Sequence, residues 1–82
     1  DMVDRREKLV ASKPAALAAK DAFTSRYVAG HPDLSVGLGL NRTGDDWAMK
    51  VFAQTQSAAR EIPESFGEFA VEVQITGSAT AT

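Results

Sequence analysis

The most regular pattern in the chain is an alternation of apolar and small residues from Leu34 to Leu40. Leucine or valine fills every second position of this stretch, and a serine and two glycines fill the positions between them. A period of two over several residues predicts a β-strand with one apolar face. Gly37 and Gly39 leave the opposite face almost without side chains. Such a face either lets another element approach closely or stays as a smooth open surface.

Two later segments alternate in a similar way and predict two more strands. In Trp47–Gln54 one face carries only apolar residues, namely Trp47, Met49, Val51 and Ala53. Lys50 and Phe52 lie on the other face, which is therefore not purely polar. Phe69–Thr76 alternates apolar with mostly polar residues. The turn-forming residues of Asn41–Asp46 predict that a hairpin loop connects the first two strands.

The segment Lys13–Ala29 is rich in alanine and predicts an amphipathic helix. We expect Ser12 to cap it, Pro14 to lie in its first turn, and Gly30 to end it. Pro14 either bends this helix or separates it from residues 1–11, which then form a loosely attached helical lead-in. The predicted buried stripe has small and aromatic members at spacings of three and four residues: Ala16, Ala19, Phe23 and Tyr27.

The order helix, strand, strand, short helix, strand (αββαβ) predicts one α+β domain over residues 1–82. We expect a three-stranded sheet with the first helix packed on one face, Ser57 capping the short helix, and a flexible tail at 77–82. Residues 55–67 are long enough for a right-handed crossover, which makes the third strand parallel to the second. The favoured order puts the glycine strand in the centre of the sheet, and the alternative puts the third strand outside the second.

Composition and charge exclude several classes of function. The nine lysines and arginines are dispersed and the net charge is −2, which is unlike the concentrated basic surface of nucleic-acid-binding proteins. No apolar run approaches the length of a membrane span. The chain has no cysteine, which excludes disulfides and thiolate metal sites. We therefore expect a cytoplasmic protein with no nucleic-acid or membrane partner.

Several short segments resemble a known type of module. They read HPxxxVGxGL from His31, KVF from Lys50, IPE from Ile62 and VEVxxTG from Val71. Together they resemble a small uncharacterised bacterial α/β module that is found alone or in front of trypsin-like peptidase domains. The resemblance covers residues 31–77 and implies the fold and an accessory role beside a peptidase. It implies no catalytic residue.

The residues that could carry chemistry have simpler structural interpretations. His31 and Asp33 flank Pro32 where a helix stops, so a turn explains them. Gly37 and Gly39 lie within a strand and no helix follows directly, which argues against a phosphate-binding loop. The oxygen-bearing residues of the 41–46 loop lack the spacing of a calcium site. A solvated edge accounts for the dispersed acidic residues Glu61, Glu64, Glu68 and Glu72.

These observations predict a non-enzymatic protein-interaction or accessory module, self-associating or partnering a peptidase, with neither cofactor nor metal. Its expected interaction or packing face comprises Gly37, Gly39, Trp47, Lys50 and Phe52. The alternative is a small hydrolase or ligand-binding protein that uses His31 and Asp33.

Overall fold

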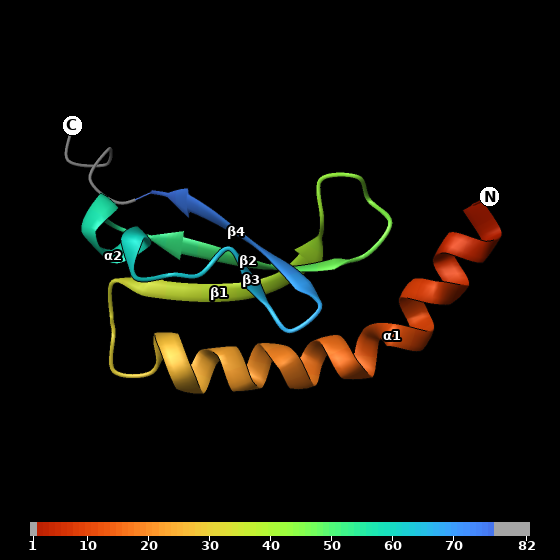
Figure 1. The fold of residues 1–82 in the computed structure, drawn as a ribbon, viewed down its shortest axis with the longest axis horizontal. Coiled ribbons are helices and arrows are strands. Elements are labelled where there is room, and N and C mark those ends of the chain that lie inside the picture. The colour runs from red at the N-terminus through yellow and green to blue at the C-terminus, as the bar shows by residue number, and fades with distance from the viewer. Residues whose placement is uncertain (1, 77–82) are drawn as a thin grey trace.

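The computed structural model describes residues 2–76 and confirms the α+β architecture, with a long helix packed on one face of a mixed sheet (Figure 1). The sheet has four strands because a short segment folds back beside the last predicted strand. Gly67, at φ 62°, lies in the tight turn that makes this possible. The elements are α1 (Met2–Phe23), a π-helical turn η1 (Thr24–Val28), β1 (Leu34–Leu40), β2 (Trp47–Ala53), α2 (Gln56–Arg60), β3 (Ser65–Phe66) and β4 (Phe69–Ile75).

The strand order is β1-β2-β4-β3, with β1 antiparallel and β4 parallel to β2. The predicted parallel direction of the last strand relative to β2 is therefore confirmed. The favoured order with the glycine strand in the centre is wrong, and the alternative order with the last strand outside β2 is confirmed. Two features explain why β2 is central. Gly37 and Gly39 give β1 little side chain to pack against two neighbours, and Lys50 of β2 lies directly opposite Glu72 of β4, a favourable cross-strand charge pair.

Helix α1 runs through Pro14 without a break, so of the two predicted alternatives the separation near Ser12 is wrong. Figure 1 shows the helix changing direction along its length, as expected where a proline cannot donate to the carbonyl one turn earlier. At this bend the indole N–H of Trp47 donates to the Leu9 carbonyl at 3.0 Å. The first turns, predicted to be a loosely attached lead-in, thus belong to α1 and are tied to the sheet.

The end of the long helix also differs from the prediction, which extended it to Ala29 as α-helix. The hydroxyl of Thr24 donates to the Lys20 carbonyl at 2.8 Å, and the N–H of Ala29 donates to the Thr24 carbonyl at 2.7 Å. The second bond spans five residues, which makes the last turn π-helical. Gly30, at φ 81°, ends the helix as predicted.

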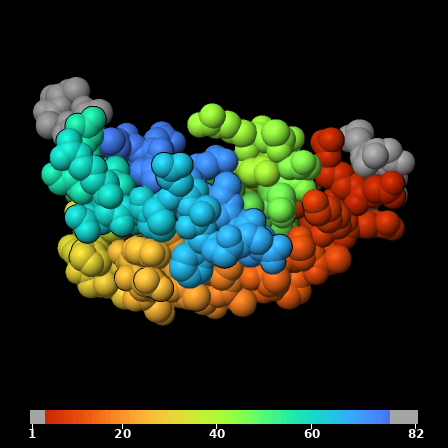
Figure 2. All heavy atoms as spheres, in the orientation of Figure 1, coloured from red at the N-terminus to blue at the C-terminus, as the bar shows by residue number. Residues whose placement is uncertain are grey.

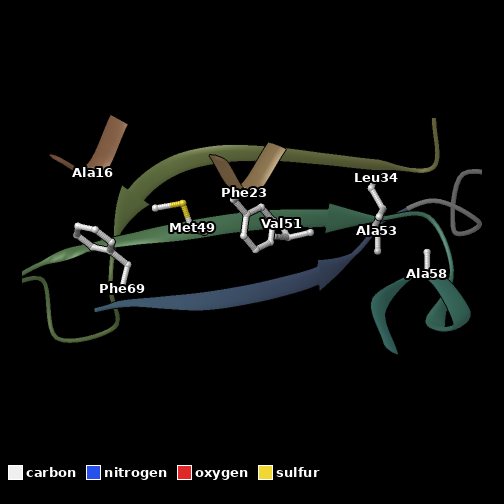
Figure 3. Close-up of a cluster of buried hydrophobic side chains, with 8 residues drawn as sticks. All are labelled: Ala16, Phe23, Leu34, Met49, Val51, Ala53, Ala58 and Phe69. Carbon is white, nitrogen blue, oxygen red and sulfur yellow. The ribbon is translucent and has the colours of Figure 1, made fainter. Parts of the chain in front are cut away.

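The core lies between α1 and the covered face of the sheet (Figure 3). Phe23, Met49 and Val51 are its largest fully buried side chains. The ring centroid of Phe23 lies 4.9 Å from that of Tyr27 and 5.3 Å from that of Phe66. The predicted stripe on the helix is confirmed. The buried cluster comprises Ala16, Phe23, Leu34, Met49, Val51, Ala53, Ala58 and Phe69.

The crossover between β2 and β4 carries α2, whose cap is Thr55 and not the predicted Ser57. The Thr55 hydroxyl accepts a hydrogen bond from the N–H of Ala58 at 3.1 Å. The predicted flexible tail, 77–82, lies outside the described residues. Over residues 2–76, no helix combines the length and apolar character needed to cross a membrane.

Candidate interaction surface

One face of the sheet carries most of the residues predicted to form an interaction surface. Strand register puts Gly37 opposite Lys50 and Ser35 opposite Phe52 on the face that points away from α1. Phe52 keeps 39% of its surface exposed there. Gly37, Gly39, Lys50 and Phe52 are therefore brought together. Trp47 lies on the other face, where it packs against the core.

The two glycines of β1 have different surroundings. A Cβ atom built on Gly39 would lie 3.0 Å from Cγ of Lys50, so this glycine makes room for the lysine stem. Nothing lies within 4 Å of a Cβ built on Gly37. The aliphatic stem of Lys50 lies over Gly39, and its ammonium group forms an ion pair with Glu72. Gly37 therefore borders open space on a face whose neighbouring charges are paired.

Two carboxylates, Glu72 on this face and Asp45 in the 41–46 loop, have lowered pKa values, which predicts a stability loss in acid. The hydrogen bond from Lys50 lowers the pKa of Glu72 below its ordinary value of 4.5, and Arg42 lowers it further. Hydrogen bonds from Thr43 and Asn41 lower the pKa of Asp45. A depressed carboxyl pKa contributes stability above the unfolded pKa, and this contribution is lost as the pH falls through the folded pKa.

We therefore expect the free energy of unfolding to fall as the pH drops below 4.5, and Glu72→Gln to weaken this dependence. Urea unfolding from neutral pH into this acid range measures both effects. Glu68→Gln is the matched control, because Glu68 is exposed and makes no ion pair within the described part of the chain. Equal acid sensitivity in wild type and Glu72→Gln would contradict the role of the Lys50–Glu72 pair.

Strand β1 is an edge of the sheet, and its backbone has a defined orientation there. The Asp33 carbonyl accepts from the N–H of Gln54 at 3.0 Å, and the N–H of Asn41 donates to the Asp46 carbonyl at 2.9 Å. In an antiparallel ladder every second residue faces its neighbour, so odd-numbered residues of β1 face β2. The residues whose N–H and C=O groups point outward include Val36, Leu38 and Leu40.

This outward edge lacks the features that usually protect an edge strand. Leu34–Leu40 contains no charge and no proline, and its pairing with β2 is one to one, without a bulge. The opposite edge of the sheet is different. Short β3 covers the start of β4, where the N–H of Val71 donates to the Glu64 carbonyl, and Glu72 adds a charge to β4. The sheet thus has one guarded edge and one unguarded edge.

The apolar side chains of β1 continue onto α1. Val36 and Leu38 are half-buried, and Leu40 is 43% exposed. Leu40 borders a groove of about 910 Å³ between the hairpin and the first turns of α1, where Val10 is 67% exposed. Figure 2 shows these turns, in red, beside the hairpin in green. The exposed apolar surface therefore spans both layers at this end of the molecule.

His31 and Asp33 line a second depression of about 470 Å³. Tyr27 and Ser57 also line it, and sequence reasoning missed both because they come from separate elements. Across residues 2–76, the His31 side chain makes no hydrogen bond with Asp33 or Ser57. The backbone around His31 forms the expected turn. Its N–H donates to the Val28 carbonyl, and its carbonyl accepts from the N–H of Leu34.

The 41–46 loop is organised by its own polar side chains, as expected for a hairpin turn. The side-chain oxygen of Asn41 accepts from the N–H of Gly44 at 2.8 Å, and the Asp45 carboxylate accepts from the Thr43 hydroxyl at 2.6 Å. Among the residues that the structure describes, no group of three His, Cys, Asp or Glu is placed to hold a metal ion.

No protein-family model, curated protein or solved structure matches the chain. The resemblance of residues 31–77 to a bacterial module beside peptidases thus stays a prediction. Function is therefore inferred from the geometry of the sheet, its edges and the depressions described above.

Proposed function

We propose that this chain is a non-enzymatic interaction module that binds an extended protein segment along β1. The observation that carries the proposal is the unguarded edge of Leu34–Leu40. A strand added there would bond to the outward backbone groups of β1 and extend the sheet, a common mode of peptide recognition. A role beside a peptidase, in the cytoplasm, is the setting that the resemblance and the absence of cysteine favour.

The side chains around the edge support binding of an apolar strand. Val36 and Leu38 are only half-buried against the core, so a neighbouring strand would remove further apolar surface from water. The glycines on the opposite face leave space beside Gly37. Main-chain hydrogen bonds would supply affinity, and the alternate side chains would supply selectivity for apolar residues on the covered face.

The test measures hydrogen exchange of the β1 amides by NMR at a concentration where the protein is monomeric. Adding a short peptide of alternating valine and threonine should slow exchange at Val36, Leu38 and Leu40. Val36→Pro should abolish this protection while retaining the fold, because it removes an outward N–H that no β2 residue uses. If the peptide leaves all three amides unchanged even at millimolar concentration, the proposed function is wrong.

A second candidate, a small hydrolase or ligand-binding protein, is favoured by the depression that contains both His31 and Asp33. His31→Ala distinguishes the two functions. Because His31 is exposed, the substitution should change the free energy of unfolding by no more than about 0.5 kcal/mol and leave peptide protection of β1 intact. Hydrolysis of a simple ester by the wild type that disappears in folded His31→Ala would instead support the hydrolase.

A further inference from the structure

We propose that the strand bound at β1 is β1 of a second copy of this chain, antiparallel to the first, with a two-fold axis at Gly37. This inference rests on the proposed function, because it names the partner of the same edge. It would join the two sheets into one continuous sheet and place an α1 from each copy on the same side.

The sequence of β1 is self-complementary in the way that a two-fold interface requires. In an isologous interface, each residue contacts its symmetry-related position on the other copy. Placing Gly37 opposite itself aligns Val36 with Leu38 of the second copy, and Leu34 with Leu40 of the second copy. Apolar residues then meet apolar residues on the covered face, and small residues meet small residues on the open face. Every residue of Leu34–Leu40 has a partner.

The backbone orientation fits the same register. Val36 and Leu38 point their N–H and C=O groups outward, so each can exchange both hydrogen bonds with the other residue of the second copy. Gly37 would fall in a non-hydrogen-bonded pair, where the Cα atoms approach to about 4.5 Å. A shift by one residue would turn the apolar face outward. Shifts by two residues keep the faces matched but leave strand ends unpaired.

The charge distribution along β1 allows the β1 strands of two copies to pair. Leu34–Leu40 carries no charged residue, so pairing two copies brings no like charges together along the edge. The nearest charge on the open face, Lys50 opposite Gly37, is already paired with Glu72. At the opposite edge of the sheet, β3 already pairs with the start of β4, so a second copy could not pair along the whole of that strand. Of the two edges, β1 is therefore the one whose full length is open to self-association.

The helical layer adds apolar surface to the same contact. Val10 lies beside Leu40 in the groove, and Leu17 is one heptad further along α1, so both occupy one helical face. Leu17 is 43% exposed and Val10 is 67% exposed. Joining the sheets would bring the two α1 helices into one layer, where this exposed strip would gain a partner of the same chemistry.

The experiment places opposite charges at the proposed axis. Wild type should be dimeric by sedimentation equilibrium. Gly37→Lys and Gly37→Glu should each weaken the dimer at least about tenfold, because like charges would meet across the axis. Mixing the two variants should restore a one-to-one heterodimer, detected by native mass spectrometry. Open space beside Gly37 lets both variants fold, which circular dichroism checks.

Gln74→Lys and Gln74→Glu are the matched controls, since Gln74 is exposed on β4, on the same face but away from β1. They should leave dimerisation unchanged. A monomeric wild type whose β1 amides are protected by added peptide would overturn self-pairing and keep the interaction module. A monomer without such protection would overturn both. The proposed two-fold axis would be overturned if charged residues at Gly37 left the dimer affinity unchanged. It would also be overturned if mixing the Lys and Glu variants did not restore a dimer.

Discussion

Phe23→Ala is expected to lower the free energy of unfolding by about 3–5 kcal/mol, the usual cost of removing a fully buried phenylalanine. Phe23 has no exposed surface, and its ring contacts those of Tyr27 and Phe66. It therefore joins α1, η1 and β3 in one cluster. A domain of this length has a total stability of about 4–12 kcal/mol, so the substitution should remove a large part of it.

Urea unfolding followed by the fluorescence of Trp47 measures this loss. Ile75→Ala is the control, because Ile75 is 46% exposed on β4, away from β1, and its truncation should cost less than about 1 kcal/mol. Similar midpoints for the two variants would mean that Phe23 is not the anchor of the helix on the sheet.

Helix α1 and strand β2 are predictable because burial of one face requires apolar residues at the spacing of a helix or of a strand. Ala16 and Phe23 recur at helical spacing and are fully buried, and Val51 alternates with Lys50 as a strand with two different faces requires. The face of each residue follows from parity alone. Gly37, Lys50 and Phe52 were grouped on one surface in the prediction and share one face, whereas Trp47, grouped with them, has the parity of Met49 and lies on the covered face.

Features that depend on tertiary contacts were not predictable in this way. Pro14 normally marks a helix start, but α1 continues through it, and the bent region presents the Leu9 carbonyl to the indole of Trp47. No local sequence pattern predicts a hydrogen bond between residues so far apart in the chain. Thr24 likewise gives no sequence signal of the π-helical turn that it begins.

Among the wrong predictions, the favoured strand order has the largest consequence for function. The alternation of β1 and β2 is equally regular, so periodicity cannot say which strand is central. Lys50 opposite Glu72 was the available signal, since it favours β2 beside β4. Once β1 is an edge strand, the outward backbone of Val36 and Leu38 becomes the main feature of the surface. The candidate site therefore moves from the bare face to the adjoining edge.

Met49→Ala is expected to cost about 2–5 kcal/mol, because it opens a cavity beneath the helix at a fully buried position. Met49→Leu conserves most of the volume and should cost less than about 1.5 kcal/mol. The comparison measures the effect of packing without a change in polarity, since the side chains of Met, Ala and Leu are all apolar. Thermal and urea unfolding provide the two measurements.

A second substitution tests how α1 lies on the sheet. Ala16 and Met49 belong to one buried cluster (Figure 3), in which a small helical residue faces a strand with a long, flexible side chain. Ala16→Leu alone should destabilise by about 1–3 kcal/mol through overpacking. Combined with Met49→Ala it should recover stability, because the leucine can fill the new cavity, so the two effects are coupled. Strictly additive losses in the double variant would mean that these two positions do not share one space, and that α1 crosses β2 at another point.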